Sequence, residues 1–140
     1  MAHITLVLGG ARSGKSTFAE GLAAADGAPV TYLATADSRD AEMAERIKIH
    51  RSRRDSSWHT WEGEPEELPA AVARISGAML LDCLTMWLTR LFLRNGDAEN
   101  EDEAVWEKRE LEIKTLTEQL CAAPQEGSRL IVVSNEVGCG

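Results

Sequence analysis

The sequence predicts an α/β domain with a mainly parallel sheet, because short apolar runs alternate with helical patterns along the chain. Two apolar runs, residues 4–8 (ITLVL) and 130–134 (LIVVS), are rich in β-branched residues, as is typical of strands in a parallel sheet. The first run leads directly into a glycine-rich loop. At 140 residues, of which 44% are hydrophobic, the chain is expected to form a single domain over residues 1–140.

The expected elements follow from periodicity and from the residues that end each run. Strands are expected at residues 4–8, 30–34, 78–82 and 130–134, with a shorter extended piece at 58–62. The first strand is expected to be buried, since its apolar residues are continuous. Helices are expected at residues 15–25, 40–51, 66–75, 84–93 and 104–121, the third with Pro65 near its first turn. Trp106, Ile113, Leu116 and Leu120 are expected to form the buried stripe of the last helix.

Charge and cysteine content narrow the class of protein. The formal net charge of −8 argues against a nucleic-acid partner, since nucleic-acid-binding domains usually carry a basic excess. The three cysteines, Cys83, Cys121 and Cys139, form neither a disulfide framework nor a CxxC pair, which favours a reducing cytoplasm. No apolar run has the length of a membrane span or a signal peptide, so neither is expected.

A phosphate-binding loop motif follows the first expected strand. The pattern G-x-x-x-x-G-K-[ST] is matched by Gly9, Gly10, Ala11, Arg12, Ser13, Gly14, Lys15 and Ser16. Glycines let the backbone N–H groups wrap a phosphate, and the following helix directs its positive end at the same anion. The motif predicts that Lys15 contacts the β and γ phosphates of a nucleotide and that Ser16 ligates Mg²⁺. A chance glycine-rich turn is the alternative, but the strand before the loop and the helix after it are the context that the motif requires.

Asp82 is the expected second ligand of the metal. It ends the apolar strand at 78–82, and a carboxylate at the carboxyl end of a core strand lies at the edge of the sheet where ligands bind. P-loop proteins hold Mg²⁺ with such a carboxylate. Capping of the next helix is the alternative role, and one side chain is able to serve both.

A basic segment stands out in this acidic chain. Its cationic or titratable members are Arg46, Lys48, His50, Arg51, Arg53 and Arg54. On a helix, Met43, Ile47 and His50 share one face, which directs His50 toward the protein. Neighbouring cations favour neutral imidazole, the nucleophilic form. Spacing leaves open whether His50 is catalytic or structural, and whether the segment binds phosphates or is a solvated helix face.

The extended piece at 58–62 would carry Trp58, Thr60 and Glu62 on one face of a strand. Its tryptophans suit either packing or a wall for a nucleotide base. Glu62 is able to accept hydrogen bonds from a ribose or a base edge. The spacing does not choose between these roles.

Taken together, these motifs resemble those of the bifunctional adenosylcobinamide kinase / adenosylcobinamide-phosphate guanylyltransferase family. The resemblance extends over the whole chain. It is carried by the loop at 9–16, Ala34-Thr35-Ala36, Glu42-Met43, Arg46-Ile47, His50-Arg51, Trp58-x-Thr60-x-Glu62-x-x-Pro65, LDCLTMWL at 81–88 and SNEVG at 134–138. The phosphate loop alone is generic, whereas this conjunction in this order is specific.

The resemblance implies a RecA-like P-loop NTPase domain of three layers that assembles as a homotrimer. It implies phosphorylation of adenosylcobinamide by ATP or GTP, then transfer of GMP from GTP to adenosylcobinamide phosphate through a histidine, with Mg²⁺ as cofactor. His50 takes the position of that histidine, and Lys15 is the other expected catalytic residue. Besides the loop at 9–16, the residues implied to touch the nucleotide are Ala34, Thr35, Ala36, Arg51, Ser52, Arg53, Arg54, Glu62 and Asp82.

The sequence departs from the family pattern in three places. Arg90 stands where the family usually has Asn, and Cys139 where members often have Met. Family members also continue into another helix and strand, so a C-terminal truncation is expected. Two other functions stay open: a different small-molecule P-loop kinase, which would not need His50, and a non-catalytic nucleotide-binding module.

Overall fold

A computed structural model of the chain describes residues 2–10, 14–25, 29–35, 58–93 and 103–135. In these ranges five strands form one sheet in the order β1-β5-β4-β2-β3, and every strand pairing is parallel. The strands are β1 His3–Gly9, β2 Val30–Ala34, β3 His59–Trp61, β4 Ala78–Asp82 and β5 Arg129–Asn135. The predicted α/β fold with a parallel sheet is therefore confirmed.

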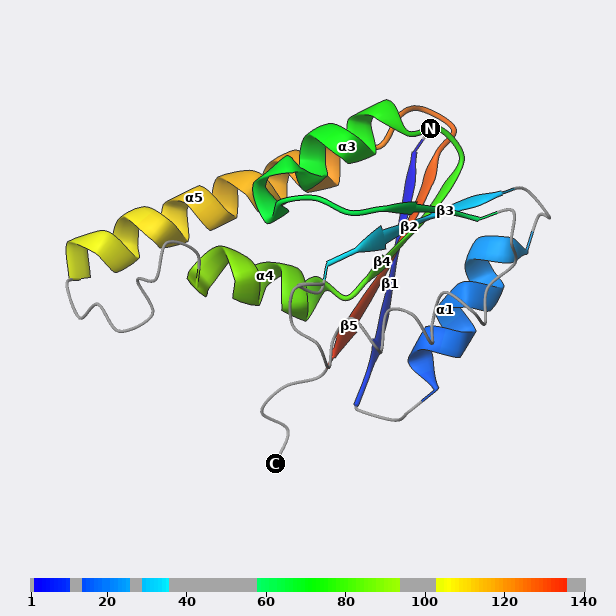
Figure 1. The fold of residues 1–140 in the computed structure, drawn as a ribbon, viewed down its shortest axis with the longest axis horizontal. Helices are drawn as coiled ribbons and strands as arrows, with labels where there is room; N and C mark the ends of the chain where they lie inside the picture. Colours follow the sequence, from blue (N-terminus) through cyan, green and yellow to red (C-terminus); the bar gives the residue numbers. More distant parts are fainter. Residues whose placement is uncertain (1, 11–13, 26–28, 36–57, 94–102, 136–140) are drawn as a thin grey trace.

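Helices cover both faces of this sheet, which gives three layers. Helix α1 lies on one face, and α3, α4 and α5 lie on the other (Figure 1). The helical elements are α1 Lys15–Ala24, the 3₁₀ turn η1 Pro65–Glu67, α3 Leu68–Arg74, α4 Leu84–Leu93 and α5 Glu103–Ala122. The helix predicted at 40–51 lies outside the described residues. No helix in the described ranges is long and apolar enough to cross a membrane.

The central strands are buried on both faces because each face has its own apolar core. In β4, Leu80 packs in the core under α1, while Met79 and Leu81 pack in the core under the other helices. In β5, Val133 and Val132 divide between the two cores in the same way. This double burial explains why both strands are continuous apolar runs in the sequence.

Strand β1 corrects one prediction, since it is parallel but mostly not buried. Leu6 and Leu8 are 53% and 58% exposed, and Ile4 is also exposed, whereas Val7 is buried. Within the described part of the chain, β1 pairs with β5 alone, and α1 packs more against β5 and β4 than against β1. A continuous apolar run predicts a parallel strand, but it does not reveal whether that strand lies at the centre or the edge of the sheet.

The predicted helix at 66–75 is divided into η1 and α3. Pro69 lies in the first turn of α3, and it has no N–H group to donate to the carbonyl four residues earlier. That carbonyl, on Pro65, instead accepts hydrogen bonds from the Leu68 N–H and from the Trp87 indole, the latter at 2.8 Å. The proline therefore tightens the start of the helix into a 3₁₀ turn.

The buried stripe of α5 includes a residue that the apolar pattern missed. Ile113 and Leu120 are buried and Leu116 packs against the core, as predicted, while Trp106 is only half-buried. Arg109 is also buried, and it donates to the Phe92 carbonyl at 2.8 Å. The Arg109 guanidinium lies 5.9 Å from the centre of the Trp106 ring, so a cation–π contact joins the two side chains.

Candidate functional site

The parallel register brings the strand ends of interest to one edge of the sheet. Gly9 lies opposite Asn135, and Ala34 lies opposite Asp82. Glu62 follows directly after β3, the outermost strand on the other side, and is exposed. The carboxyl edge therefore carries the phosphate loop, Asp82 and the end of β2 within one row, as the motifs predict.

The described part of the phosphate loop has the backbone that an anion site needs. Gly14 is the N-cap of α1 and has φ +80°, a left-handed conformation that favours glycine. No side chain caps the first turn of α1. The N–H groups at the start of this helix are therefore directed at the loop without a competing side-chain acceptor.

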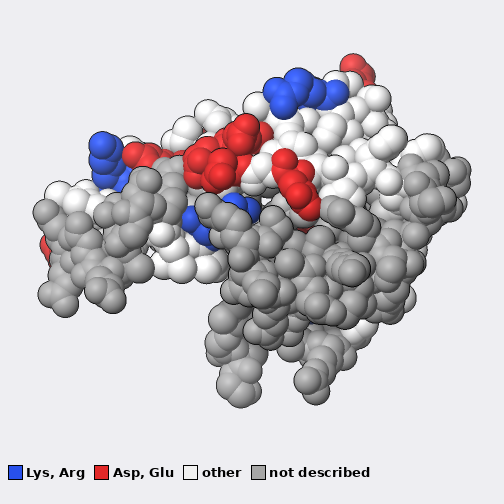
Figure 2. All heavy atoms as spheres, in the orientation of Figure 1, with Lys and Arg blue, Asp and Glu red and all other residues white. Residues whose placement is uncertain are grey.

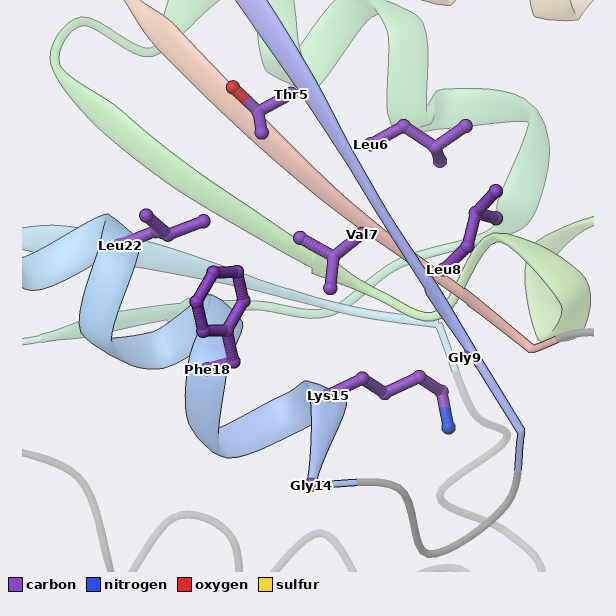
Figure 3. A pocket seen from close by; sticks show the side chains of 9 residues that line it. All are labelled: Thr5, Leu6, Val7, Leu8, Gly9, Gly14, Lys15, Phe18 and Leu22. Carbon is purple, nitrogen blue, oxygen red and sulfur yellow. The ribbon is translucent and has the colours of Figure 1, made fainter.

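Lys15 extends from the first turn of α1 toward the end of β1 (Figure 3). Its ammonium group donates a hydrogen bond of 3.0 Å to the Gly10 carbonyl. A pocket of about 520 Å³ lies between β1 and α1 beside the loop, and Lys15 is the one charged side chain among the described residues that line it. An ammonium group whose partner among the described residues is one backbone carbonyl can exchange that carbonyl for a phosphate oxygen.

The side chains of Ser16 and Asp82 are in contact at the carboxyl edge of the sheet. The Ser16 hydroxyl donates a hydrogen bond of 3.2 Å to the Asp82 carboxylate. Helix α1 makes this possible because it crosses from the end of β1 onto β5 and β4. Both oxygens are hard ligands of the kind that Mg²⁺ prefers. Among the described residues there is no group of three or more His, Cys, Asp and Glu that could hold a metal ion, and Mg²⁺ on phosphates needs only one or two protein ligands. The residues present therefore fit Mg²⁺.

The turn after Asp82 is held by Thr35. Thr35 follows β2, and its hydroxyl accepts a hydrogen bond of 2.9 Å from the Cys83 N–H. The same hydroxyl lies 3.1 Å from the carbonyl oxygens of both Asp82 and Cys83, and it shares its one proton between them. The Asp82–Cys83 peptide bond is cis. Thr35 is 2% exposed, so its side chain faces the protein backbone and not the solvent.

Three further residues join this network, and the sequence motifs predict a role for none of them. Arg90 on α4 donates a hydrogen bond of 3.1 Å to the Thr35 carbonyl. The Asn135 N–H donates to the Thr85 hydroxyl at 3.3 Å, and the Asn135 amide group lies 3.9 Å from the Cys83 sulfur. Their signal in the sequence is weak: Arg90 is notable only as a departure from the family pattern, and Thr85 and Asn135 only as members of longer motifs.

The Cys83 thiol lies in the same network, and its pKa depends on the groups around it. Burial raises the pKa of Cys83 above its usual value, and the Asp82 carboxylate raises it further. Hydrogen bonds from the backbone of Met86 and Thr85, together with the charge of Lys15, act in the opposite direction. The thiol therefore stays protonated near neutral pH.

The remaining predicted site residues lie outside the described part of the chain. They are Ala11, Arg12, Ser13, Ala36, His50, Arg51, Ser52, Arg53 and Arg54. The structure therefore brings together Gly9, Gly10, Gly14, Lys15, Ser16, Ala34, Thr35 and Asp82 along one edge, and places Glu62 at the end of the outermost strand. Figure 2 shows acidic side chains gathered near η1 and along α5, in keeping with the net charge of −8.

Comparison with known proteins decides the family. The family model described as cobinamide kinase / cobinamide phosphate guanyltransferase matches residues 5–140. The chain belongs to this family. The earlier resemblance is thereby confirmed, together with the expectation that the chain is an enzyme of this family.

Curated relatives agree with the family match. The chain is 44% identical over 138 residues to the bifunctional adenosylcobalamin biosynthesis protein CobP of Pseudomonas aeruginosa, covering 96% of this chain and 72% of that protein. It is 39% identical over 139 residues to the bifunctional adenosylcobalamin biosynthesis protein CobU of Escherichia coli, covering 96% of this chain and 76% of the relative. A protein of the same name from Salmonella typhimurium is 38% identical. The matches span nearly the whole chain and do not rest on the phosphate loop alone.

Proposed function

We propose that this chain phosphorylates adenosylcobinamide with a nucleoside triphosphate and then transfers GMP from GTP to adenosylcobinamide phosphate through a covalent intermediate on His50. The hydrogen bond between Ser16 and Asp82 carries this proposal most directly. It joins the phosphate loop to the carboxylate of β4, which is the arrangement that holds a nucleotide with its metal. The family match supplies the acceptor and the order of the two transfers.

Lys15, Ser16, Asp82 and the first turn of α1 each have a chemical role in this proposal. Lys15 leaves the Gly10 carbonyl and neutralises charge on the phosphates, while the N–H groups at the start of α1 bind the same oxygens. Ser16 and Asp82 would hold Mg²⁺, which when bound offsets phosphate charge and orients the triphosphate. These groups serve both transfers, because both need the triphosphate held in one place.

His50 separates the two transfers. Its imidazole would attack the α-phosphorus of GTP and release pyrophosphate, and the GMP would then pass to the phosphate of the corrinoid. Support comes from its position in the family motif and from the cationic neighbours Arg51, Arg53 and Arg54. Glu62, at the end of β3, would accept hydrogen bonds from the nucleotide.

Assembly as a homotrimer in the cytoplasm is part of the proposal. The exposed apolar side chains of β1, Ile4, Leu6 and Leu8, offer surface for contact between copies. Light scattering of the purified chain tests this, and a monomer at all concentrations would contradict it.

The test of the covalent step uses GTP labelled at the α-phosphate in the presence of Mg²⁺. We expect denatured protein to keep the label, acid to release it, and His50→Ala to abolish it. His59→Ala is the matched control, because His59 is an exposed histidine on β3 and its loss should leave the label in place.

The two steps are separated by a second measurement on the same variant. His50→Ala should lose nucleotidyl transfer and keep part of the phosphorylation of adenosylcobinamide. Equal loss of both activities would contradict this division of labour. Absence of label in the unaltered chain, with GTP binding measured separately, would favour a plain P-loop kinase or a non-catalytic nucleotide-binding module.

A further inference from the structure

The hydroxyl of Thr35 lies behind the proposed metal site and not in it. Thr35 is 2% exposed, and the polar contacts of its hydroxyl are with the backbone of Asp82 and Cys83. The family resemblance implies that this residue touches the nucleotide, but a buried hydroxyl engaged by three backbone groups has little left to offer a ligand.

We propose that Thr35 is a positioning residue, which fixes the peptide after Asp82 so that the Asp82 carboxylate faces Ser16 and Mg²⁺. The inference rests on the proposed function, since it concerns the metal of that same site. Thr35 acts through Asp82, and neither the metal nor the nucleotide contacts its side chain.

The pairing between β2 and β4 ends at Ala34 and Asp82, so the next residue of each strand has no ladder partner across that gap. The Cys83 N–H is buried at this point and needs an acceptor. Thr35 is the next residue of the neighbouring chain segment, and its hydroxyl supplies that acceptor at 2.9 Å.

The same hydroxyl also constrains the carboxylate side of the turn. Its one proton is shared between the Asp82 and Cys83 carbonyl oxygens, each at 3.1 Å. The peptide that links Asp82 to Cys83 is therefore held at both its N–H and its C=O, and the carbonyl of the next peptide is held as well. The Asp82 side chain branches from the residue fixed in this way. The Asp82 carboxylate in turn accepts the 3.2 Å hydrogen bond from the Ser16 hydroxyl. These two oxygens are the proposed protein ligands of Mg²⁺.

Arg90 extends the support by one layer. It donates to the Thr35 carbonyl from α4, the helix that begins immediately after the turn. Thr35, which follows β2, thus holds the turn between β4 and α4. Arg90 on α4 in turn holds the backbone of Thr35. Outer groups that orient metal ligands in this way commonly alter metal affinity about 10- to 100-fold when they are removed.

The test measures how Mg²⁺ changes the affinity for a non-hydrolysable GTP analogue, by equilibrium binding to the full chain. Thr35→Val keeps the branched shape and removes the hydroxyl. We expect its affinity without Mg²⁺, in EDTA, to equal that of the unaltered chain, and its half-saturating Mg²⁺ concentration to rise about 10- to 100-fold. Thr35→Ser should restore the original value.

Two further variants sharpen the result. Thr117→Val is the matched control, because it removes a threonine hydroxyl that donates to the Ile113 carbonyl within α5, away from the phosphate loop, and it should change nothing in the Mg²⁺ titration. Arg90→Met tests the outer layer, and also replaces Thr35→Val if that variant does not fold. It should raise the half-saturating Mg²⁺ concentration by a smaller factor.

Three outcomes would overturn the proposal. An unchanged Mg²⁺ titration in folded Thr35→Val would do so, as would an unchanged titration in Arg90→Met where Thr35→Val does not fold. An equal loss of affinity with and without Mg²⁺ would show that Thr35 serves the nucleotide directly. If the unaltered chain itself showed no Mg²⁺-dependent binding, the proposed nucleotide site would fall first, and this inference with it.

Discussion

Two hydroxyl groups approach Asp82 from neighbouring elements, and the structure uses them differently. Ser16, in the first turn of α1, is half-buried and donates to the Asp82 carboxylate. Thr35, at the end of β2, is buried and bonds the backbone on either side of the Asp82–Cys83 peptide. One hydroxyl is placed where a ligand can replace its partner, and the other is fully committed to the protein.

This difference separates residues that touch the ligand from residues that shape the site. On the phosphate-loop side, Lys15 and Ser16 each make one side-chain hydrogen bond to the described residues, and a ligand could replace either partner. The β2 side forms a closed network with Cys83 and Arg90. Substitutions on the first side should therefore change ligand affinity and turnover, and substitutions on the second should also change stability.

The largest effect is expected for Lys15→Ala. Removing the ammonium group leaves phosphate charge unneutralised in both transfers, so kcat/KM should fall about 100- to 1000-fold for each. Steady-state kinetics of phosphorylation and of nucleotidyl transfer measure this. Normal GTP binding and turnover in the variant would show that the loop assignment is wrong.

A smaller effect separates the two hydroxyls themselves. Ser16→Ala removes a proposed metal ligand without touching the buried network, so the free energy of unfolding should change by less than about 0.5 kcal/mol. Thr35→Val leaves the buried Cys83 N–H without its acceptor and should lower the free energy of unfolding by about 1–3 kcal/mol. Urea denaturation compares the two variants in one experiment. Equal stability losses would remove the distinction drawn between the two sides.

Most elements of the fold were predictable, because periodicity and breakers act locally. Strands β2 and β4 and helix α4 have the bounds that the sequence predicts. The position of β1 in the sheet was not predictable in the same way. The order β1-β5-β4-β2-β3 depends on contacts between segments far apart in the chain, and no local pattern of residues 4–8 encodes its place. The start of α3 was missed for a local reason, the missing N–H of Pro69.

The residues of the candidate site also differ in whether a local pattern predicts them. Gly14, Lys15 and Ser16 were predictable from a contiguous motif whose chemistry is known, and Asp82 from its place at the end of an apolar run. The role of Thr35 was not predictable, because it depends on the register that places it opposite the turn after Asp82. Arg90 reaches the Thr35 carbonyl from a different helix, so only the tertiary structure reveals that contact.

The smallest expected effect concerns the thiol of Cys83, which lies inside the network of the β2 side. Alkylation requires the thiolate, and burial raises the pKa of Cys83, so its alkylation should be slow at neutral pH and accelerate only above the usual range for a thiol. Cys121 is exposed on α5 and should react first. Peptide mapping by mass spectrometry after timed alkylation distinguishes the two sites.

Thr35→Val and Ser16→Ala should also differ in the rate of alkylation at Cys83. Loss of the Thr35 hydroxyl frees the backbone of Cys83 and should increase the rate of alkylation at Cys83 several-fold, because the turn opens more often than in the unaltered chain. Ser16→Ala should leave that rate unchanged, with Cys121 as the internal reference in both variants. Equal rates at Cys83 in the two variants would mean that the turn after Asp82 is held by the sheet and helix around it, and that the Thr35 hydroxyl contributes nothing to its closure.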